Sequence, residues 1–267
     1  MTIIRPSLPP VLREALSRAR GSLGDKARQT KTYAGQQRLK YGLISGVLPE
    51  QQIQRIGNYD TARISERELS FIHMGRNSLT GQIVALKQSG DPLFDHMVGQ
   101  EAEVLQRLQA NGIVKYLGLV ERPHCLVEEF VFGAPVAELH PTFPESLYVA
   151  LRSLNALKAI HRAGITHPDL NLDNTIVSAS GALTYIDFNL SHTANEFSRP
   201  EEFIGAKRLD IYLAAHKLGF LFHQLKGPAS PAAQLFPQKI KGAFNDLAFP
   251  YKTCDEFLGA IYEKLAE

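Results

Sequence analysis

The chain has few of the features that mark secreted, membrane-spanning or repetitive proteins. Its two cysteines, Cys125 and Cys254, are too few for a disulfide framework in 267 residues. No apolar run reaches the length of a membrane span, and the N-terminus lacks the apolar core of a signal peptide. No internal repeat or low-complexity tract is present. We therefore expect a reducing, cytoplasmic compartment, with export into another cell left open.

Charge and size narrow the class further. The net charge is +2, so the composition predicts no nucleic acid or other general polyanion as a partner. The nine histidines show no metal-ligand spacing. With 44% hydrophobic residues, a chain of 267 residues can bury either one two-lobed core or two small ones.

Two short polar segments carry the chemistry that the sequence suggests. The first, 167–174, reads His-Pro-Asp-Leu-Asn-Leu-Asp-Asn, and the second, 187–189, reads Asp-Phe-Asn. Between them, 175–178 and 182–186 predict two strands joined by a Ser-Gly turn, which would bring the second segment back beside the end of the first. Phosphoryl transfer needs a carboxylate beside the attacking hydroxyl and further oxygen ligands for Mg²⁺. The alternative is a helix cap and an ordinary turn, since Asp and Asn are common in both.

In this order and spacing, the two segments resemble the catalytic loop and the magnesium loop of the protein kinases and their relatives. The resemblance implies an α+β, two-lobed protein-kinase-like fold with a small antiparallel-sheet lobe and a trimmed helical large lobe. It also implies ATP and Mg²⁺ as cofactors. In that scheme Asp169 accepts the proton of the substrate hydroxyl, while Asn174 and Asp187 hold Mg²⁺.

The chain then divides into a basic helical extension (1–50), the small lobe (51–132) and the large lobe (133–267). The extension has nine lysines and arginines against three acidic residues, so it carries +6 and the remainder carries −4. Two helical patterns, near 9–20 and 33–45, flank a polar Gly-Ser-Leu-Gly stretch. Either the extension is a solvated basic face on a segment packed against the small lobe, or it docks an acidic partner or an anionic membrane surface.

The segments upstream agree with the kinase resemblance. Residues 80–87 predict a turn and an apolar strand ending at Lys87, similar to the kinase strand whose lysine contacts the nucleotide phosphates. The alternative is a solvent-facing lysine at a strand end. An Asp-Pro cap signal predicts a helix over 91–108, and apolar spacing places Glu101 on its buried stripe. A buried carboxylate needs a partner, for which we expect Lys87, whereas Glu103 points away from the stripe.

Residues 124–133 resemble the strand and hinge that bind adenine. The resemblance implies that backbone groups of Glu129 and Val131 meet the base. The side chain at the back of that pocket would be Glu128, where kinases usually place an apolar or hydroxyl residue. Glu128 either forms a local salt bridge or narrows the pocket.

Two helical patterns frame the large lobe. A stripe of apolar residues predicts a helix over 145–163 that stops at Gly164. The run 209–222 resembles the buried helix whose first-turn aspartate, here Asp210, anchors the catalytic loop.

One departure from the kinase pattern concerns the phosphates. No glycine-rich loop is present, and 56–65 occupies its expected place with a single glycine, Gly57. Backbone amides approach a phosphate less closely without glycine, so we expect side chains of Thr61, Ser65 or Arg63 to contact the nucleotide instead.

Other departures concern control and substrate. Pro168 stands where an arginine usually precedes the catalytic aspartate, so a phosphate on the following segment has no ready cation. The segment 187–210 is short and leaves few residues for a peptide-binding platform. Asn189 replaces the glycine after Asp-Phe, and asparagine tolerates a left-handed backbone.

Three functions fit these observations. A Ser/Thr protein kinase that needs no activation-loop phosphorylation is favoured by 80–87 and the hinge. A small-molecule or lipopolysaccharide-core sugar kinase is favoured by the loops at 169–174 and 186–189 and by the short segment after Asp187. Taken together, the departures from the kinase pattern resemble compact bacterial protein kinases and the lipopolysaccharide-core sugar kinases. A pseudokinase binding module is favoured by the missing glycine loop and by Glu128, although the full set of polar groups argues against it.

Overall fold

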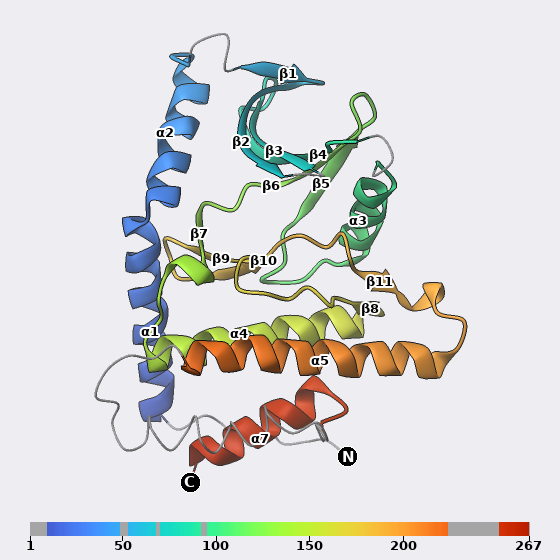
Figure 1. Cartoon of the computed structure of the whole chain (residues 1–267). Coiled ribbons are helices and arrows are strands. Elements are labelled where there is room, and N and C mark those ends of the chain that lie inside the picture. The colour runs from blue at the N-terminus through green and yellow to red at the C-terminus, as the bar shows by residue number, and fades with distance from the viewer. Residues whose placement is uncertain (1–9, 49–52, 68–69, 92–94, 224–250, 267) are drawn as a thin grey trace.

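The computed structural model describes residues 10–48, 53–67, 70–91, 95–223 and 251–266. It has a small lobe built on a curled antiparallel sheet and a large lobe in which helices dominate (Figure 1). The predicted α+β, two-lobed fold is therefore confirmed. Within the described residues, no helix combines the length and the apolarity needed to cross a membrane.

The small lobe is a six-stranded sheet with one helix. Its elements are β1 (Gln54–Ile56), β2 (Tyr59–Arg67), β3 (Ser70–Asn77), β4 (Ile83–Ser89), α3 (Asp95–Arg107), β5 (Tyr116–Val120) and β6 (Cys125–Glu129). The strands lie in the order β1-β2-β3-β4-β6-β5, with antiparallel neighbours throughout. Turn chemistry sets the β3–β4 hairpin, because Gly81 takes a left-handed φ of 73° and Asn77 Oδ1 accepts a backbone hydrogen bond from Thr80. The helix predicted over 91–108 is α3, described over Asp95–Arg107, and the proline of the predicted Asp-Pro cap signal lies outside the described residues.

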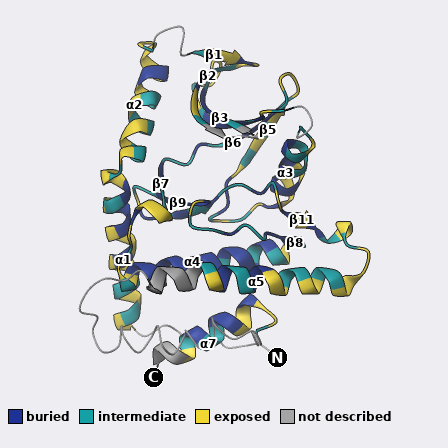
Figure 2. Cartoon of the chain, viewed as in Figure 1, coloured by how far each residue is buried: buried dark blue, intermediate teal, exposed yellow. Residues whose placement is uncertain are grey.

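The large lobe holds three described helices and two small sheets. Its elements are β7 (Gly133–Pro135), the 3₁₀ turn η3 (Val136–Glu138), α4 (Phe143–Arg162), β8 (Ile165–Thr166), β9 (Thr175–Ser178), β10 (Leu183–Tyr185), β11 (His192–Thr193), the 3₁₀ turn η4 (Ala194–Glu196), α5 (Pro200–His223) and α7 (Cys254–Ala266). Helix α4 lies at the centre and is buried along most of its length (Figure 2). It ends before Gly164, whose φ is 74°, as predicted, and begins two residues earlier than predicted.

Helix α5 differs from the sequence prediction at its start. It begins at Pro200, so Asp210 lies near its middle and not in its first turn. Proline is favourable at the first helical position because its missing N–H would have no partner there and its φ already suits a helix. The long α5 therefore crosses the whole large lobe beside α4 (Figure 1).

The N-terminal extension also differs from expectation. Helix α1 (Pro10–Gln29) runs straight through the Gly-Ser-Leu-Gly stretch, and the chain breaks instead at Thr30, which caps α2 (Lys31–Ser45). The predicted break is wrong because Gly24 serves close packing: a Cβ there would lie 2.6 Å from the carbonyl oxygen of Ala179. The β9–β10 turn approaches α1 still more closely at Gly181, where a Cβ would overlap the carbonyl oxygen of Arg20.

The extension packs against both lobes, not against the small lobe alone (Figure 1). Leu23 of α1 is fully buried in the large-lobe core, and Leu43 of α2 is buried against the small-lobe sheet. Between them, Gln36 Oε1 accepts a hydrogen bond of 3.0 Å from the backbone amide of Gly133, and Lys40 Nζ lies 4.8 Å from the ring centroid of Phe132. The two helices thus form a brace behind the segment that joins the lobes.

Candidate active site

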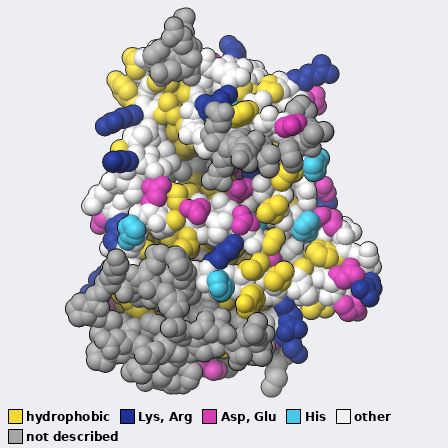
Figure 3. All heavy atoms as spheres, in the orientation of Figure 1, with side chains coloured by type: hydrophobic (Ala, Val, Ile, Leu, Met, Phe, Trp, Pro, Cys, Tyr) yellow, Lys and Arg dark blue, Asp and Glu magenta, His cyan; other side chains and the backbone are white. Residues whose placement is uncertain are grey.

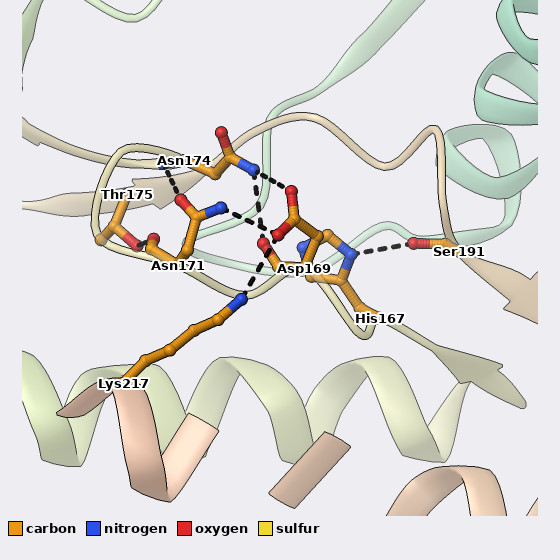
Figure 4. Close-up of polar contacts among 7 residues, drawn as sticks. All are labelled: His167, Asp169, Asn171, Asn174, Thr175, Ser191 and Lys217. Atoms are coloured by element: carbon orange, nitrogen blue, oxygen red, sulfur yellow. Dashed lines mark hydrogen bonds and ion pairs between the residues drawn. The ribbon is translucent and has the colours of Figure 1, made fainter. Parts of the chain in front are cut away.

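The loop between β8 and β9 gathers polar side chains around one carboxylate, Asp169 (Figure 4). Asn171 Nδ2 donates to Asp169 Oδ1 over 2.9 Å, and Asn174 Nδ2 donates to Asp169 Oδ2 over 2.8 Å. The loop is closed on itself, since Asn171 Oδ1 accepts from the backbone amide of Asn174 and its carbonyl accepts from Thr175 Oγ1. These bonds fix the orientation of the carboxylate before any substrate is bound.

Two buried groups anchor this loop from below. Asp210 Oδ2 accepts a 2.7 Å hydrogen bond from the backbone amide of His167 and lies 2.9 Å from His161 Nε2, so the predicted anchor is present. His167 Nδ1 lies 2.9 Å from Ser191 Oγ, and its ring stacks on Phe188 with centroids 4.3 Å apart. Burial lowers the pKa of His167 to about 4, so its ring is neutral near pH 7.

The hairpin places the second polar segment as predicted. Tyr185 pairs with Thr175 across β9 and β10, and the backbone amide of Ile186 donates to the carbonyl of Asn174 over 3.0 Å. Asp187 therefore leaves the hairpin beside the end of the Asp169 loop. The left-handed residue here is Asp187, with a φ of 67°, and not Asn189 as the sequence suggested.

The predicted ion pair of Lys87 with Glu101 is present, and Lys87 also pairs with Asp187 of the large lobe. Lys87 Nζ lies 2.7 Å from Glu101 Oε2 and 2.5 Å from Asp187 Oδ1. Burial by itself lowers the pKa of Lys87, but the two carboxylates outweigh it and raise that pKa above its ordinary value. Glu101 Oε1 also accepts the backbone amide of Phe188 over 2.8 Å, so α3 fixes both the lysine and the Asp187 segment.

The hinge places Glu128 on the same side of the sheet as Lys87. Glu128 lies opposite Ala85 in the β4–β6 ladder, and Ala85 and Lys87 are two residues apart on one face of β4. Among the described residues Glu128 forms no ion pair, and its Oε2 is buried without a hydrogen-bond partner. Burial, followed by the negative charge of Glu101, raises the pKa of Glu128 to about 8. Of the two predicted roles, the local salt bridge is therefore wrong.

Glu129 and Val131 occupy the predicted hinge positions. Glu129 is the last residue of β6, and its amide donates to the carbonyl of Lys115 over 2.9 Å. That leaves the carbonyl of Glu129 as its candidate contact for a base. Val131 follows, half-buried, in the segment without regular secondary structure before β7.

The phosphate loop expected at 56–65 is wrong. These residues form β1, the two-residue turn at Gly57 and most of β2. Ser65 lies within β2 opposite Ile72, next to a register shift in the β2–β3 ladder, and not in a turn. Further along the chain, Arg67 pairs with Ser70 across β2 and β3, and residues 68–69 between them lie outside the described residues.

One functional contact has no counterpart in the sequence prediction. Lys217 Nζ of α5 lies 3.3 Å from Asp169 Oδ1 (Figure 4). The available signal was its spacing: Lys217 follows the anchor Asp210 by seven residues, which places both on one face of a helix.

On the face seen in Figure 3, acidic side chains lie along the band between the two lobes. The carboxylates of Asp169 and Asp187 come from separate loops, and the Oδ1 of Asn174 points away from Asp169 (Figure 4). Carboxylate and amide oxygens are ligands that suit Mg²⁺.

Comparison with known proteins agrees with this geometry. A family model for the protein kinase domain matches residues 65–214, more than half of the chain. Among curated proteins, the chain is similar to serine/threonine-protein kinase dst2 of Dictyostelium discoideum, with 28% identity over 153 residues that make up 53% of this chain and 13% of that protein. It is 30% identical over 140 residues (45% of this chain, 8% of the relative) to mitogen-activated protein kinase kinase kinase mkh1 of Cytospora mali.

CBL-interacting protein kinase 25 of Oryza sativa subsp. japonica is 26% identical over 149 residues, 49% of this chain and 29% of that protein. The chain thus spans less than a third of the length of each of these relatives. All three come from eukaryotes, so they do not support the likeness to compact bacterial kinases.

Proposed function

The chain belongs to the protein kinase family, and from this premise we propose that it is an ATP- and Mg²⁺-dependent phosphotransferase that acts on serine or threonine hydroxyls of proteins. The observation that carries the proposal is the convergence of Lys87, Glu101 and Asp187 on one ion-paired cluster, beside the ordered Asp169 loop. These groups come from four separate segments. A scaffold that only bound partners would have no need of the complete set.

The residues fit the cofactors that the family implies. Asp187 and Asn174 would hold Mg²⁺ through side-chain oxygens, and Lys87, kept in place by Glu101, would contact the nucleotide phosphates. When bound, Mg²⁺-ATP supplies the γ-phosphoryl group and neutralises part of its charge. Asp169 orients the substrate hydroxyl and accepts its proton as the new P–O bond forms.

The acceptor is the finer part of the proposal. Serine/threonine kinases are among the relatives of this chain, which supports a protein hydroxyl. The short segment after Asp187 is what a sugar-phosphorylating relative would also show, so a lipopolysaccharide sugar is the competing acceptor.

We also propose that activity needs no phosphate on the segment after Asp187. Pro168 leaves no arginine in front of Asp169 to pair with one. Ser191 and Thr193 are buried, and only Ser198 of the three hydroxyl residues between Asp187 and Asp210 is exposed. A buried hydroxyl is not accessible to a modifying enzyme.

For the basic extension, a structural brace is the role we propose, in preference to docking of an acidic partner or an anionic membrane. Arg20 Nε donates to the carbonyl of Ser180, Arg28 to that of Ala179, and Lys26 pairs with Glu145. These cations are thus engaged with the large lobe. The compartment we propose is the cytosol, supported by two free, buried cysteines.

The test uses labelled ATP and Mg²⁺ with the protein alone, with a generic protein substrate and with a lipopolysaccharide extract. Transfer of labelled phosphate to protein supports the proposal. Transfer to lipopolysaccharide would show that the acceptor is a sugar, and the absence of any transfer would show that the chain is a pseudokinase. Asp169→Ala should nearly abolish transfer but keep nucleotide binding, whereas Asp187→Ala should also remove metal-dependent binding. Asp173→Ala, an exposed aspartate of the same loop, is the matched control and should stay active.

A further inference from the structure

Helix α5 contributes two charged groups to the floor of the site. Asp210 binds the backbone of the Asp169 loop, and Lys217, two helical turns later, extends toward the carboxylate itself (Figure 4). The Nζ of Lys217 lies 3.3 Å from Asp169 Oδ1, and both side chains are 30% exposed. An ion pair exposed to this extent contributes little to folding stability, so stability alone does not explain the contact.

The charges around the site show what Lys217 adds. The other lysine of the site, Lys87, is buried, and its ammonium group pairs with the carboxylates of both Glu101 and Asp187. Within the described part of the chain, Asp169 forms an ion pair with one cationic side chain, that of Lys217. The remaining hydrogen bonds to Asp169 come from the neutral amides of Asn171 and Asn174.

The geometry of transfer brings the phosphoryl group to this lysine. A hydroxyl bound to Asp169 must attack phosphorus from about 3–3.5 Å. The hydroxyl and the ammonium would then be neighbours of one carboxylate, so a rotation of the lysine stem would be enough to turn the ammonium toward the equatorial phosphoryl oxygens. Lysine suits this position because its flexible stem lets the charge move from one anion to another.

Resting on the proposed phosphotransferase activity, we propose that Lys217 is a catalytic residue whose ammonium leaves Asp169 Oδ1 and binds the transferring phosphoryl group. The substrate hydroxyl takes its place on Asp169. The bond from the hydroxyl oxygen to phosphorus then forms, the bond from phosphorus to the bridging oxygen of ADP breaks, and the hydroxyl proton passes to Asp169. Lys217 keeps its proton throughout and stabilises the charge on the phosphoryl oxygens.

The test compares Lys217→Ala, Lys217→Gln and Lys217→Arg with Lys207→Ala. Lys207 is a matched control, because it lies on the same helix but stacks on Phe203 away from the loop. Circular dichroism checks the fold of each variant. The measurements are kcat, KM for ATP, and binding of Mg²⁺ with ADP and with a non-hydrolysable ATP analogue.

We expect Lys217→Ala and Lys217→Gln to lower kcat about 100-fold, the loss typical of one missing transition-state donor. They should weaken binding of the ATP analogue but not of ADP, because only the analogue carries the γ-phosphate. Lys217→Arg should recover part of kcat, and Lys207→Ala should match the wild type. Equal binding of the analogue by folded Lys217→Gln and wild type, or an unchanged kcat, would overturn the inference.

The two proposals fail in different ways. If the wild type transfers no phosphate to any acceptor, the proposed function fails. The comparison of the analogue with ADP still decides whether Lys217 contacts the γ-phosphate. If Asp169→Ala abolishes transfer while Lys217→Gln keeps the full rate, the function stands and the role of Lys217 falls.

Discussion

Gly24 of helix α1 lies directly against the carbonyl of Ala179 in the β9–β10 turn, where a Cβ would stand 2.6 Å from the carbonyl oxygen. This contact seats the extension on the hairpin that delivers Asp187 to the site. Gly21, one turn earlier in the same helix, has nothing within 4 Å of its Cβ position. Close packing therefore explains the glycine at position 24 but not the one at position 21.

The same substitution at these two glycines should have opposite effects. Gly24→Ala forces a backbone shift and should lower the free energy of unfolding by about 1–3 kcal/mol. Gly21→Ala, which only gains helix propensity, should raise it by about 0.5–1 kcal/mol. Urea unfolding of both variants measures the difference. A Gly24→Ala protein as stable as Gly21→Ala would show that α1 does not dock on the hairpin.

A second prediction concerns the cations of the extension. Lys26 Nζ lies 2.6 Å from Glu145 Oε2, a carboxylate that is 1% exposed and caps α4. Burial by itself raises the pKa of Glu145, but the bonds from Lys26 and the start of α4 outweigh it and lower that pKa. Lys26→Ala should therefore cost about 1–3 kcal/mol of stability, because it leaves a buried carboxylate without its cation.

Arg18 provides the control for Lys26. Its pair with Glu14 is exposed on both sides, so Arg18→Gln should change the free energy of unfolding by less than about 0.5 kcal/mol. Thermal unfolding at low and moderate salt compares the two variants. If both variants lost the same small amount of unfolding free energy, the extension would be a solvated basic face and not a brace.

The hydroxyls after Asp187 give a third prediction. Ser191→Ala removes the partner of buried His167 Nδ1 and should cost about 1–3 kcal/mol of stability. Ser198→Ala, at the exposed position, should leave the free energy of unfolding close to that of the wild type and the rate of phosphate transfer within a few-fold of it. A hundredfold loss of rate in Ser198→Ala, about 2.7 kcal/mol of transition-state stabilisation, would reveal a loop switch.

A fourth prediction follows from Glu128. Its pKa is raised to about 8 in the folded protein, so between its ordinary value and pH 8 the folded state binds more protons than the unfolded state. The contribution of the Glu128 carboxyl to the free energy of unfolding therefore falls as pH rises through that window, by at most about 1.4 kcal/mol per pH unit. Glu128→Gln keeps the shape but removes the proton, so its melting temperature relative to wild type should rise from pH 5 to pH 8.

Glu129→Gln is the matched control for Glu128→Gln. Glu129 is next along β6 but its side chain is 45% exposed, so this variant controls for the loss of a carboxylate from the same strand. Melting curves of both variants and the wild type, recorded at several pH values, measure these differences in melting temperature. A flat difference for Glu128→Gln would mean that its carboxyl is ionised in the folded state.

Much of the fold and the central site could be predicted from the sequence because they depend on local pattern. The β9–β10 hairpin, α4 with its stop at Gly164, and the pairing of Lys87 with Glu101 follow from strand signals, turn residues and helical spacing. Boundaries were less predictable. Helix α5 begins at Pro200, well before the expected start, because propensity and capping, not burial, set that end.

Contacts between segments far apart in the chain account for two further errors, and strand pairing accounts for a third. A glycine pair predicted a break in the first helix, but close packing on Ala179 explains Gly24 without one. The expected phosphate loop became a β1–β2 hairpin because strand pairing, not glycine content, set the register there. The left-handed backbone fell on Asp187 and not on Asn189, since Lys87 and Glu101 hold that segment.

The sequence by itself determined which groups the site contains and their order, because helix, hairpin and turn formation depend on neighbours along the chain. Only the tertiary structure decided that Lys217 meets Asp169, that burial raises the pKa of Glu128 and that α2 contacts Gly133. Each of these depends on burial and on distances between segments that lie many residues apart. Coulomb and desolvation energies depend on those distances, and no local pattern in the sequence encodes them.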